Sequence, residues 1–212
     1  MLSNCPASGD RGISLRMAPQ RRIAGPNAKN RAVLLDAAER VMIAGGYAAV
    51  SSRRVAAEAG LKPQLVHYYF RTMDDLFLAV FRRRADEGVE RQARALASDH
   101  PVRALWEFSI DPRGTALTME FIALANHRKV IRAEIARYAE QFRVQQIAAL
   151  STVPGRDSLD VQSLPPVVLS VLLTSLSRVL VMEQALGMSA GHADTVELVE
   201  RCLRRLDDGP PT

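Results

Sequence analysis

Apolar residues recur every three or four positions along most of the chain, which is the spacing of one face of an α-helix. The first such stretch runs from Val33 to Met42 and ends at Gly45 and Gly46, where glycine favours a stop. Beyond Pro101 no stretch alternates between apolar and polar residues as a half-buried strand does. The sequence therefore predicts an all-α protein.

Two short helices are expected after the first one. Ser51 or Ser52 is placed to cap a helix that Gly60 breaks. Pro63 suits the first turn of the next helix, which reaches about Phe70. The pattern predicts two short helices that are joined by a tight turn.

Longer helices follow. Thr72 and Asp75 have the spacing of a capping box at the start of a helix that runs to about Ala97. We expect a polar loop over 153–163, around Pro154 and Gly155. Further helices are predicted over 102–108, 115–126, 130–150, 165–186 and 192–206.

Positive charge is concentrated in the first part of the chain. The protein has 212 residues and a formal net charge of +5. Residues 1–84 carry 14 basic and 6 acidic residues, a net charge of +8, and the remainder has a net charge of −3. Clustered cations favour contact with a polyanion such as nucleic acid, although a solvated basic surface has the same composition.

The two short helices meet the steric demands of a helix-turn-helix. A small residue must stand where the helices cross, a glycine must turn the chain, and apolar residues must lock the second helix. Ala56 and Gly60 fill the first two positions. The inward offsets are occupied by Val55, Ala59, Leu61, Val66 and Tyr69. An ordinary helical hairpin explains any one of these residues, but their combination favours DNA binding.

A longer run of residues resembles the N-terminal domain of TetR-family transcriptional regulators. The residues that carry the resemblance are Leu34, Ala37, Ala38, Gly46, Tyr47, Val50, Ser51, Val55, Ala56, Ala59, Gly60, Leu61, His67, Tyr68, Tyr69, Phe70, Thr72, Asp75 and Leu76. The chain departs from the family pattern at Lys62, His67 and Met73.

The resemblance implies a homodimer with three DNA-binding helices followed by a bundle of about six more, the last two of which form the dimer interface. On this basis we expect a basic extension over 1–27 without stable structure, a DNA-binding domain over 28–88, and an effector-binding and dimerisation domain over 89–207.

Candidate DNA contacts lie on the outer face of the second short helix and at the start of the first. Lys62, Gln64, His67 and Tyr68 are expected to point outward. Gln64 is the best candidate for reading a base, because glutamine bonds adenine bidentately. Phosphate contacts are expected from Ser52, Arg53, Lys62 and Tyr69. For His67 a contact and a structural role are both open.

The predicted bundle contains candidates for an effector pocket and for a dimer interface. An apolar cavity would be lined by Trp106, Phe108, Phe121, Leu124, Tyr138, Phe142 and Met182, although residues of these types at helical spacing are usually core. The resemblance implies a pocket, and we expect a small apolar effector. The dimer interface is expected to contain Val168, Leu172, Leu176, Val179 and Leu203.

The sequence lacks the motifs of several other classes of protein. The histidines His67, His100, His127 and His192 are far apart, and Cys5 and Cys202 are near neither each other nor a histidine, so we expect no metal site and no disulfide framework. No nucleotide-binding or nucleophile motif occurs, so we expect no cofactor and no enzymatic activity.

No membrane partner is expected. The longest uncharged stretch, 161–177, is interrupted by Pro165 and Pro166 and looks too short and too polar to span a bilayer. The start of the chain lacks the apolar segment of a secretory signal, which favours the cytoplasm.

The sequence thus favours a dimeric repressor that binds a palindromic operator in double-stranded DNA and is released by a small apolar molecule. Two alternatives remain open: a nucleoid-type protein that binds DNA without sequence preference, and a helical lipid-binding protein whose basic head touches a membrane.

Overall fold

A computed structural model describes residues 26–152 and 164–208 of the chain. These residues form nine α-helices, one short 3-10 helix and no strand, which confirms the predicted all-α class. The helices are α1 (Pro26–Gly45), α2 (Ser52–Glu58), α3 (Pro63–Tyr69), α4 (Met73–Leu96), α5 (Pro101–Ser109), α6 (Pro112–Ala125), α7 (Lys129–Leu150), α8 (Pro166–Ala185) and α9 (His192–Asp208), and the 3-10 helix is Tyr47–Ala49.

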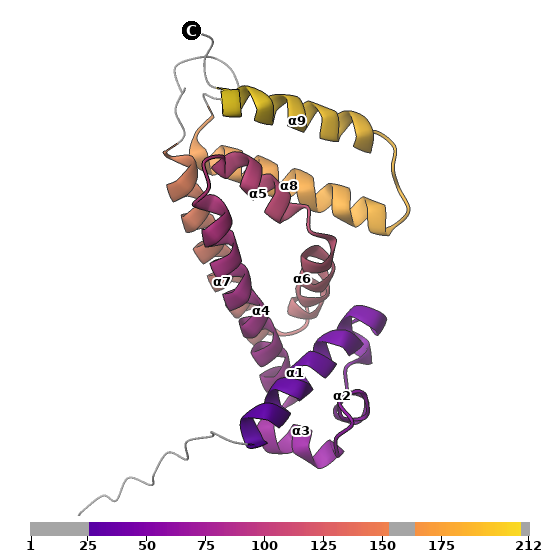
Figure 1. The fold of residues 1–212 in the computed structure, drawn as a ribbon. Coiled ribbons are helices and arrows are strands. Elements are labelled where there is room, and N and C mark those ends of the chain that lie inside the picture. Colours follow the sequence, from indigo (N-terminus) through magenta and orange to yellow (C-terminus); the bar gives the residue numbers. More distant parts are fainter. Residues whose placement is uncertain (1–25, 153–163, 209–212) are drawn as a thin grey trace, which may run out of the picture.

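The helices α1 to α3 and the start of α4 form a small head at one end of the molecule (Figure 1). Ser51 caps α2, since its Oγ accepts a hydrogen bond from the backbone N–H of Arg54 at 3.3 Å. Gly60 turns the chain with a φ of 65°, a backbone conformation that residues other than glycine rarely adopt. Pro63 then stands in the first turn of α3, as predicted.

The inward positions of the predicted motif form the core of the head. Val55 and Ala56 are fully buried and Val66 is 1% exposed. Ala59, Leu61 and Tyr69 are half-buried and pack against the same core, which also contains Leu34, Leu35, Ala37, Ala38, Val41, Met42, Phe70, Leu76, Phe77 and Val80. The predicted inward face of the helix-turn-helix is therefore confirmed.

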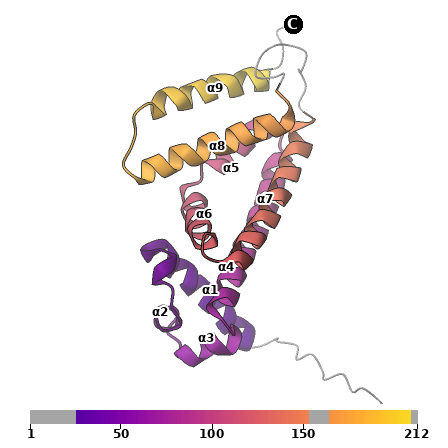
Figure 2. The same ribbon diagram turned by 180° about the vertical axis from the view of Figure 1, so that it is seen from behind.

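Helix α4 begins in the head and ends in the body, the part of the molecule formed by the later helices (Figures 1 and 2). Its capping box is confirmed: Thr72 Oγ1 accepts from Asp75 N at 3.1 Å, and Asp75 Oδ2 accepts from Thr72 N at 3.0 Å. Leu76 and Phe77 lie in the core of the head, whereas Leu96 lies in a core shared with α5, α7, α8 and α9. One rigid helix thus spans both parts.

A buried polar seam joins α4, α7 and α8 in the body. Gln92 is fully buried and accepts a hydrogen bond from Gln146 Nε2 at 2.7 Å. Ser170 Oγ donates to Gln146 Oε1, and Arg143 of α7 donates to Ser170. Because each buried polar group has a partner, the seam fixes the register of the three helices at little cost.

Most helix boundaries lie within two residues of the sequence-based expectation, and the starts of α1 and α6 differ most. Helix α1 begins at Pro26, so residues 26 and 27, which we assigned to the extension, form its first turn. Helix α6 begins at Pro112 rather than Thr115, because Asp111 Oδ1 accepts from Arg113 N at 3.1 Å and caps the helix earlier. The extension before Pro26 and the loop over 153–163 lie outside the described residues.

Helix α8 is the one described helix that is long and apolar enough to span a bilayer, judged by length and composition. Our expectation that no segment would qualify is wrong in this respect, because Pro165 and Pro166 precede or open the helix rather than break it. Soluble helices that are apolar on two faces pass the same test. One face of α8 buries Ser170, Thr174 and Ser177, which are polar residues held in hydrogen bonds.

Ion pairs of Glu134 join α4 to α7, and they should make the stability of the fold depend on pH. Glu134 Oε1 accepts from Arg82 Nε at 2.8 Å and from Arg137 at 2.9 Å. These hydrogen bonds, from Arg137 foremost, lower the pKa of Glu134 from 4.5 to about 2. A lowered pKa in the folded state contributes stability that is complete above the ordinary value and is lost as pH falls toward the folded value.

We expect Glu134→Gln to lower the free energy of unfolding at pH 7 by about 1 kcal/mol, since both guanidinium groups are largely solvated. The deficit should shrink as pH falls from 4.5 toward 2, because the wild-type carboxylate is then protonated. Urea unfolding of the wild type and the variant at several pH values measures this stability deficit. Glu90→Gln, on an exposed residue of α4, is the control. A deficit that is independent of pH contradicts the prediction.

Candidate nucleic-acid interface

The outer face of α3 is exposed at the end of the head farthest from the body (Figure 1). Lys62, Gln64, His67 and Tyr68 are all exposed, and Tyr68 retains 64% of its accessible surface. The helix is fixed from behind by buried Val66, so these side chains are presented on a rigid support. Their predicted outward placement is confirmed, and their contacts with DNA stay a prediction.

The remaining candidates for phosphate contacts differ in exposure. Arg53 is exposed in the first turn of α2. Ser52 is half-buried, and the cap of α2 is Ser51, which leaves the Ser52 hydroxyl outside that role. Tyr69 is half-buried, and its ring packs edge-on against Tyr68 at 5.0 Å between centroids. Tyr69 therefore serves the core of the head and has only part of its surface left for DNA.

Within the head, the acidic side chains are all paired, whereas several basic side chains have no carboxylate partner among the described residues. Every carboxylate between residues 26 and 88 has a bonding partner in the described part of the chain. Arg83 pairs with Asp36 at 2.6 Å and with Glu39 at 3.3 Å, and Arg40 pairs with Glu58 at 2.6 Å. In the head, the exposed cations without a carboxylate partner among the described residues are Lys29, Arg31, Arg53, Arg54, Lys62 and Arg71.

This sorting leaves uncompensated positive charge around α3. The basic side chains that remain free of carboxylates include those at both ends of α3, whereas the arginines at the seams between helices are neutralised. A polyanion that lies along α3 would meet cations without first breaking ion pairs. Arg31 in α1 and Arg71 directly after α3 were not among the predicted phosphate contacts, which were sought on α2 and α3.

Six of the seven residues predicted to line an effector cavity do not line the groove described below. Trp106 is 2% exposed in the core shared by α5, α8 and α9. Phe121 and Leu124 belong to the core of the head, and Tyr138 and Phe142 pack in a third cluster. Met182 is half-buried on α8. The ring of Phe81 packs against both Phe121 and Tyr138, with centroid distances of 5.2 and 5.5 Å, and the rings of Phe142 and Phe108 are 6.3 Å apart. Trp106 lies apart from these rings, in the core of the body. Their role in binding an effector stays a prediction.

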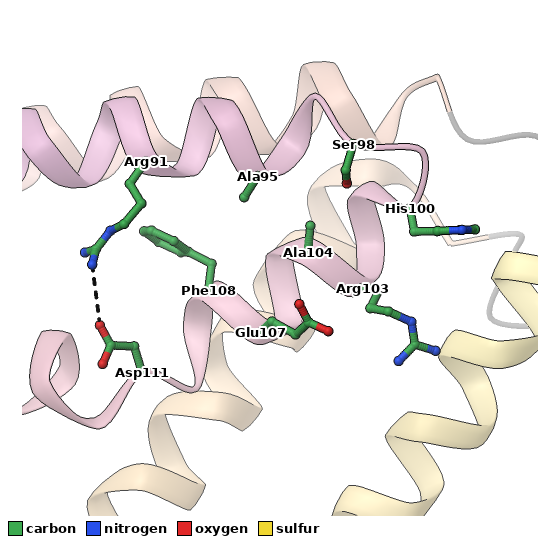
Figure 3. Close-up of a pocket in the computed structure, with 9 residues that line it drawn as sticks. All are labelled: Arg91, Ala95, Ser98, His100, Arg103, Ala104, Glu107, Phe108 and Asp111. Carbon is green, nitrogen blue, oxygen red and sulfur yellow. Dashed lines mark ion pairs between the residues drawn. The ribbon is translucent and has the colours of Figure 1, made fainter.

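An open groove of about 540 Å³ lies between α4 and α5 (Figure 3). Phe108 forms part of its wall, and the guanidinium carbon of Arg91 lies 5.4 Å from the centre of that ring. Arg91 also reaches Asp111 at 3.8 Å. The other lining residues are Ala95, Ser98, His100, Arg103, Ala104 and Glu107. Phe108 is thus the one predicted cavity residue that lines this groove.

The predicted dimer residues divide between an exposed face and the protomer core. Val168, Leu172 and Val179 are 39%, 51% and 43% exposed on α8. Leu176 is half-buried and packs against the core of the body. Leu203 of α9 is 1% exposed in that core, so its assignment to an interface between protomers is wrong.

The fold and the exposed reading helix define an all-α regulator with an N-terminal helix-turn-helix. Residues 34–80 match the family model of the bacterial regulatory proteins, tetR family. The HTH-type transcriptional regulator BetI of Rhizobium meliloti (strain 1021) is 27% identical over 139 residues, which cover 61% of this chain and 68% of that protein. Over its helix-turn-helix domain the chain is therefore similar to TetR-family transcriptional regulators.

Solved structures share the fold of most of the chain. A putative TetR-family transcriptional regulator from Rhodococcus sp. has a TM-score of 0.67 at 17% identity, covering 85% of this chain and 97% of that one. A putative transcriptional regulator from Saccharomonospora viridis, in complex with choline, has a TM-score of 0.68 at 18% identity, covering 77% of this chain and 88% of that one. At these identities the likeness concerns the fold.

Proposed function

We propose that this protein is a repressor that binds a palindromic operator as a homodimer through α3 and that a small apolar molecule releases it. The observation that carries the proposal is the exposed outer face of α3, which is surrounded by cations without carboxylate partners among the described residues. In this proposal Gln64 reads a base, while Arg53 at the start of α2 and Lys62 at the start of α3 hold phosphates.

A decisive first experiment selects genomic fragments bound by the purified protein and then compares two variants on the selected operator. Gln64→Ala should relax the preference at one position of each half-site, at a cost of about tenfold in affinity, because it removes a bidentate base contact. Arg53→Ala should weaken binding to all sequences alike and flatten the salt dependence, because it removes a phosphate contact. Fluorescence anisotropy on operator and scrambled duplexes measures both effects.

Arg113→Ala is the matched control, since it removes the same charge from an exposed residue in the body. If Gln64→Ala and Arg53→Ala lose affinity equally on every duplex, the two roles are wrongly assigned. If the wild-type protein has no preferred sequence at raised salt, it behaves as the nucleoid-type alternative. Binding to anionic vesicles in place of duplex DNA would favour the lipid-binding alternative.

We infer further that two copies meet through α8. Exposed valine and leucine side chains follow one face of this helix, at Val168, Val171, Leu172 and Val179. Leu198 adds a 53% exposed side chain on α9. Apolar patches of this kind mark interaction sites, and a second copy that presents the same face covers it by two-fold symmetry.

Two observations support the effector proposal: a groove in the body, and a similar fold in a solved structure that contains a ligand. The solved structure from Saccharomonospora viridis is a complex with choline. The groove beside Phe108 has the volume of a small-molecule site. Candidate effectors are fatty acyl and aromatic compounds, with choline as a further probe. We place this activity in the cytoplasm and propose no enzymatic step for the protein.

A further inference from the structure

Arg31 of α1 is held against the end of the reading helix. Its guanidinium carbon lies 5.3 Å from the centre of the Phe70 ring. Phe70 is the C-cap of α3 and is 3% exposed, so its ring is a fixed platform. Arg71 follows directly and is exposed. Two arginines from different elements therefore stand together at the C-terminal end of α3.

Both arginines keep their charge available. Neither Arg31 nor Arg71 pairs with a carboxylate in the described part of the chain. Stacking on Phe70 orients the guanidinium of Arg31 but consumes none of its five N–H donors. An arginine that is oriented before binding loses less side-chain entropy when it bonds a phosphate. This arrangement favours recognition of a phosphodiester over a purely structural contact.

The position of this pair complements the contacts proposed for the other end of α3. Helix α3 has seven residues and is about 10 Å long, which is close to the 12 Å width of the major groove. Lys62 is the N-cap of α3, whereas Arg71 directly follows its C-cap, Phe70, and Arg31 lies over the Phe70 ring. A helix seated in the groove thus has cations at both of its ends.

We propose that Arg31 and Arg71 form a second phosphate anchor, which binds backbone phosphates at the C-terminal end of the reading helix, distinct from those bound by Arg53 and Lys62. The proposal rests on the proposed DNA binding by α3 and deepens it. The anchor carries no sequence information itself. It fixes how far α3 is turned about the groove, and therefore which bases Gln64 can reach.

The test maps individual phosphates on the selected operator by ethylation interference, together with affinity as a function of salt. Arg31→Ala and Arg71→Ala should each weaken operator binding about tenfold and reduce the slope of log K against log salt by about 0.9. For each variant, ethylation should stop weakening binding at certain phosphates. Ethylation at those same phosphates should still weaken binding by Arg53→Ala. Arg31→Lys should recover the salt slope but only part of the affinity, since it keeps the charge and loses the planar stack.

Arg113→Ala serves again as the control for net charge, and thermal melting by circular dichroism checks that each variant is folded. The second anchor is overturned if folded Arg31→Ala and Arg71→Ala bind the operator like Arg113→Ala. It is also overturned if they lose interference at the same phosphates as Arg53→Ala. A wild-type protein without a preferred operator overturns the proposed function instead, so the two failures are distinguishable.

Discussion

Replacing Leu172 and Val179 together by glutamate is expected to yield a folded monomer that no longer binds a full operator. Both residues are about half exposed on α8 and stand two helical turns apart, so they share one face. Because they are exposed in the protomer, the charges should leave its core intact. Buried in an interface, however, two unpaired carboxylates on each subunit would cost far more than the lost apolar contact.

The effect on DNA binding should be large because a dimer gains affinity from two linked half-sites. Without the link, each head binds as a separate module, and the affinity for the full operator should fall by about 100-fold or more. Binding to an isolated half-site should change little. Sedimentation velocity and anisotropy on full and half operators measure both quantities.

Met119→Glu with Ile122→Glu is the matched control, since these residues are 39% and 45% exposed on α6. A dimer that survives the α8 substitutions unchanged would contradict the assignment of this face. Leu176 and Leu203 are unsuitable for the test. They pack within the protomer, so a charge there would unfold the chain and imitate the loss of the dimer.

Leu203, which was predicted at the dimer interface but is buried within the protomer, illustrates what the sequence alone can predict. Periodicity identifies an apolar face but does not say whether that face meets its own chain or a partner. The final helix turns Val199 and Leu203 toward the body, leaving Leu198 exposed. For the same reason, periodicity could not say which of the predicted effector residues lie together. The spacing of Trp106, Phe121 and Tyr138 marks them as inward, but the crossing of helices distributes them among separate cores.

The head was predictable because its signals are local. The Gly60 turn and the capping box at Thr72 act within a few residues, so sequence spacing alone specifies them, and the cap of α2 was narrowed to Ser51 or Ser52 before the structure identified Ser51. The sorting of charge was not predictable, since it depends on pairs such as Arg83 with Asp36, which are 47 positions apart. The packing of α1 against α2 and α4, and of α4 against α7, decides which cations are neutralised.

The contacts between head and body suggest how an effector would act on α3. Glu120 of α6 accepts a hydrogen bond from the backbone N–H of Tyr47, just before α2, with an oxygen-to-nitrogen distance of 2.7 Å. Arg128, in the turn after α6, pairs with Asp74 at the start of α4 at 3.2 Å. The segment around α6 therefore holds the head on two sides. A shift of α6 would tilt α3 and change the spacing of paired heads, which must match one DNA turn of about 34 Å.

We expect an effector that releases the operator to bind less tightly when operator is present, by the same factor by which it weakens DNA binding. For the wild-type protein that factor should lie between about 5 and 150. Glu120→Ala should bring it close to one, because the bond from Tyr47 to α6 is lost. Glu120→Gln should retain most of the coupling, since its amide oxygen still accepts that N–H.

The measurement is a titration of fatty acyl compounds, aromatic compounds and choline into the protein with and without operator, followed by calorimetry on each variant. Its strength is that Glu120→Ala and Glu120→Gln lose the same charge, so a difference between them isolates the hydrogen bond. If both variants couple as strongly as the wild type, transmission does not pass through Glu120. If a ligand binds the wild-type protein equally well with and without operator, that ligand is no inducer, because a molecule with equal affinity for two states shifts neither.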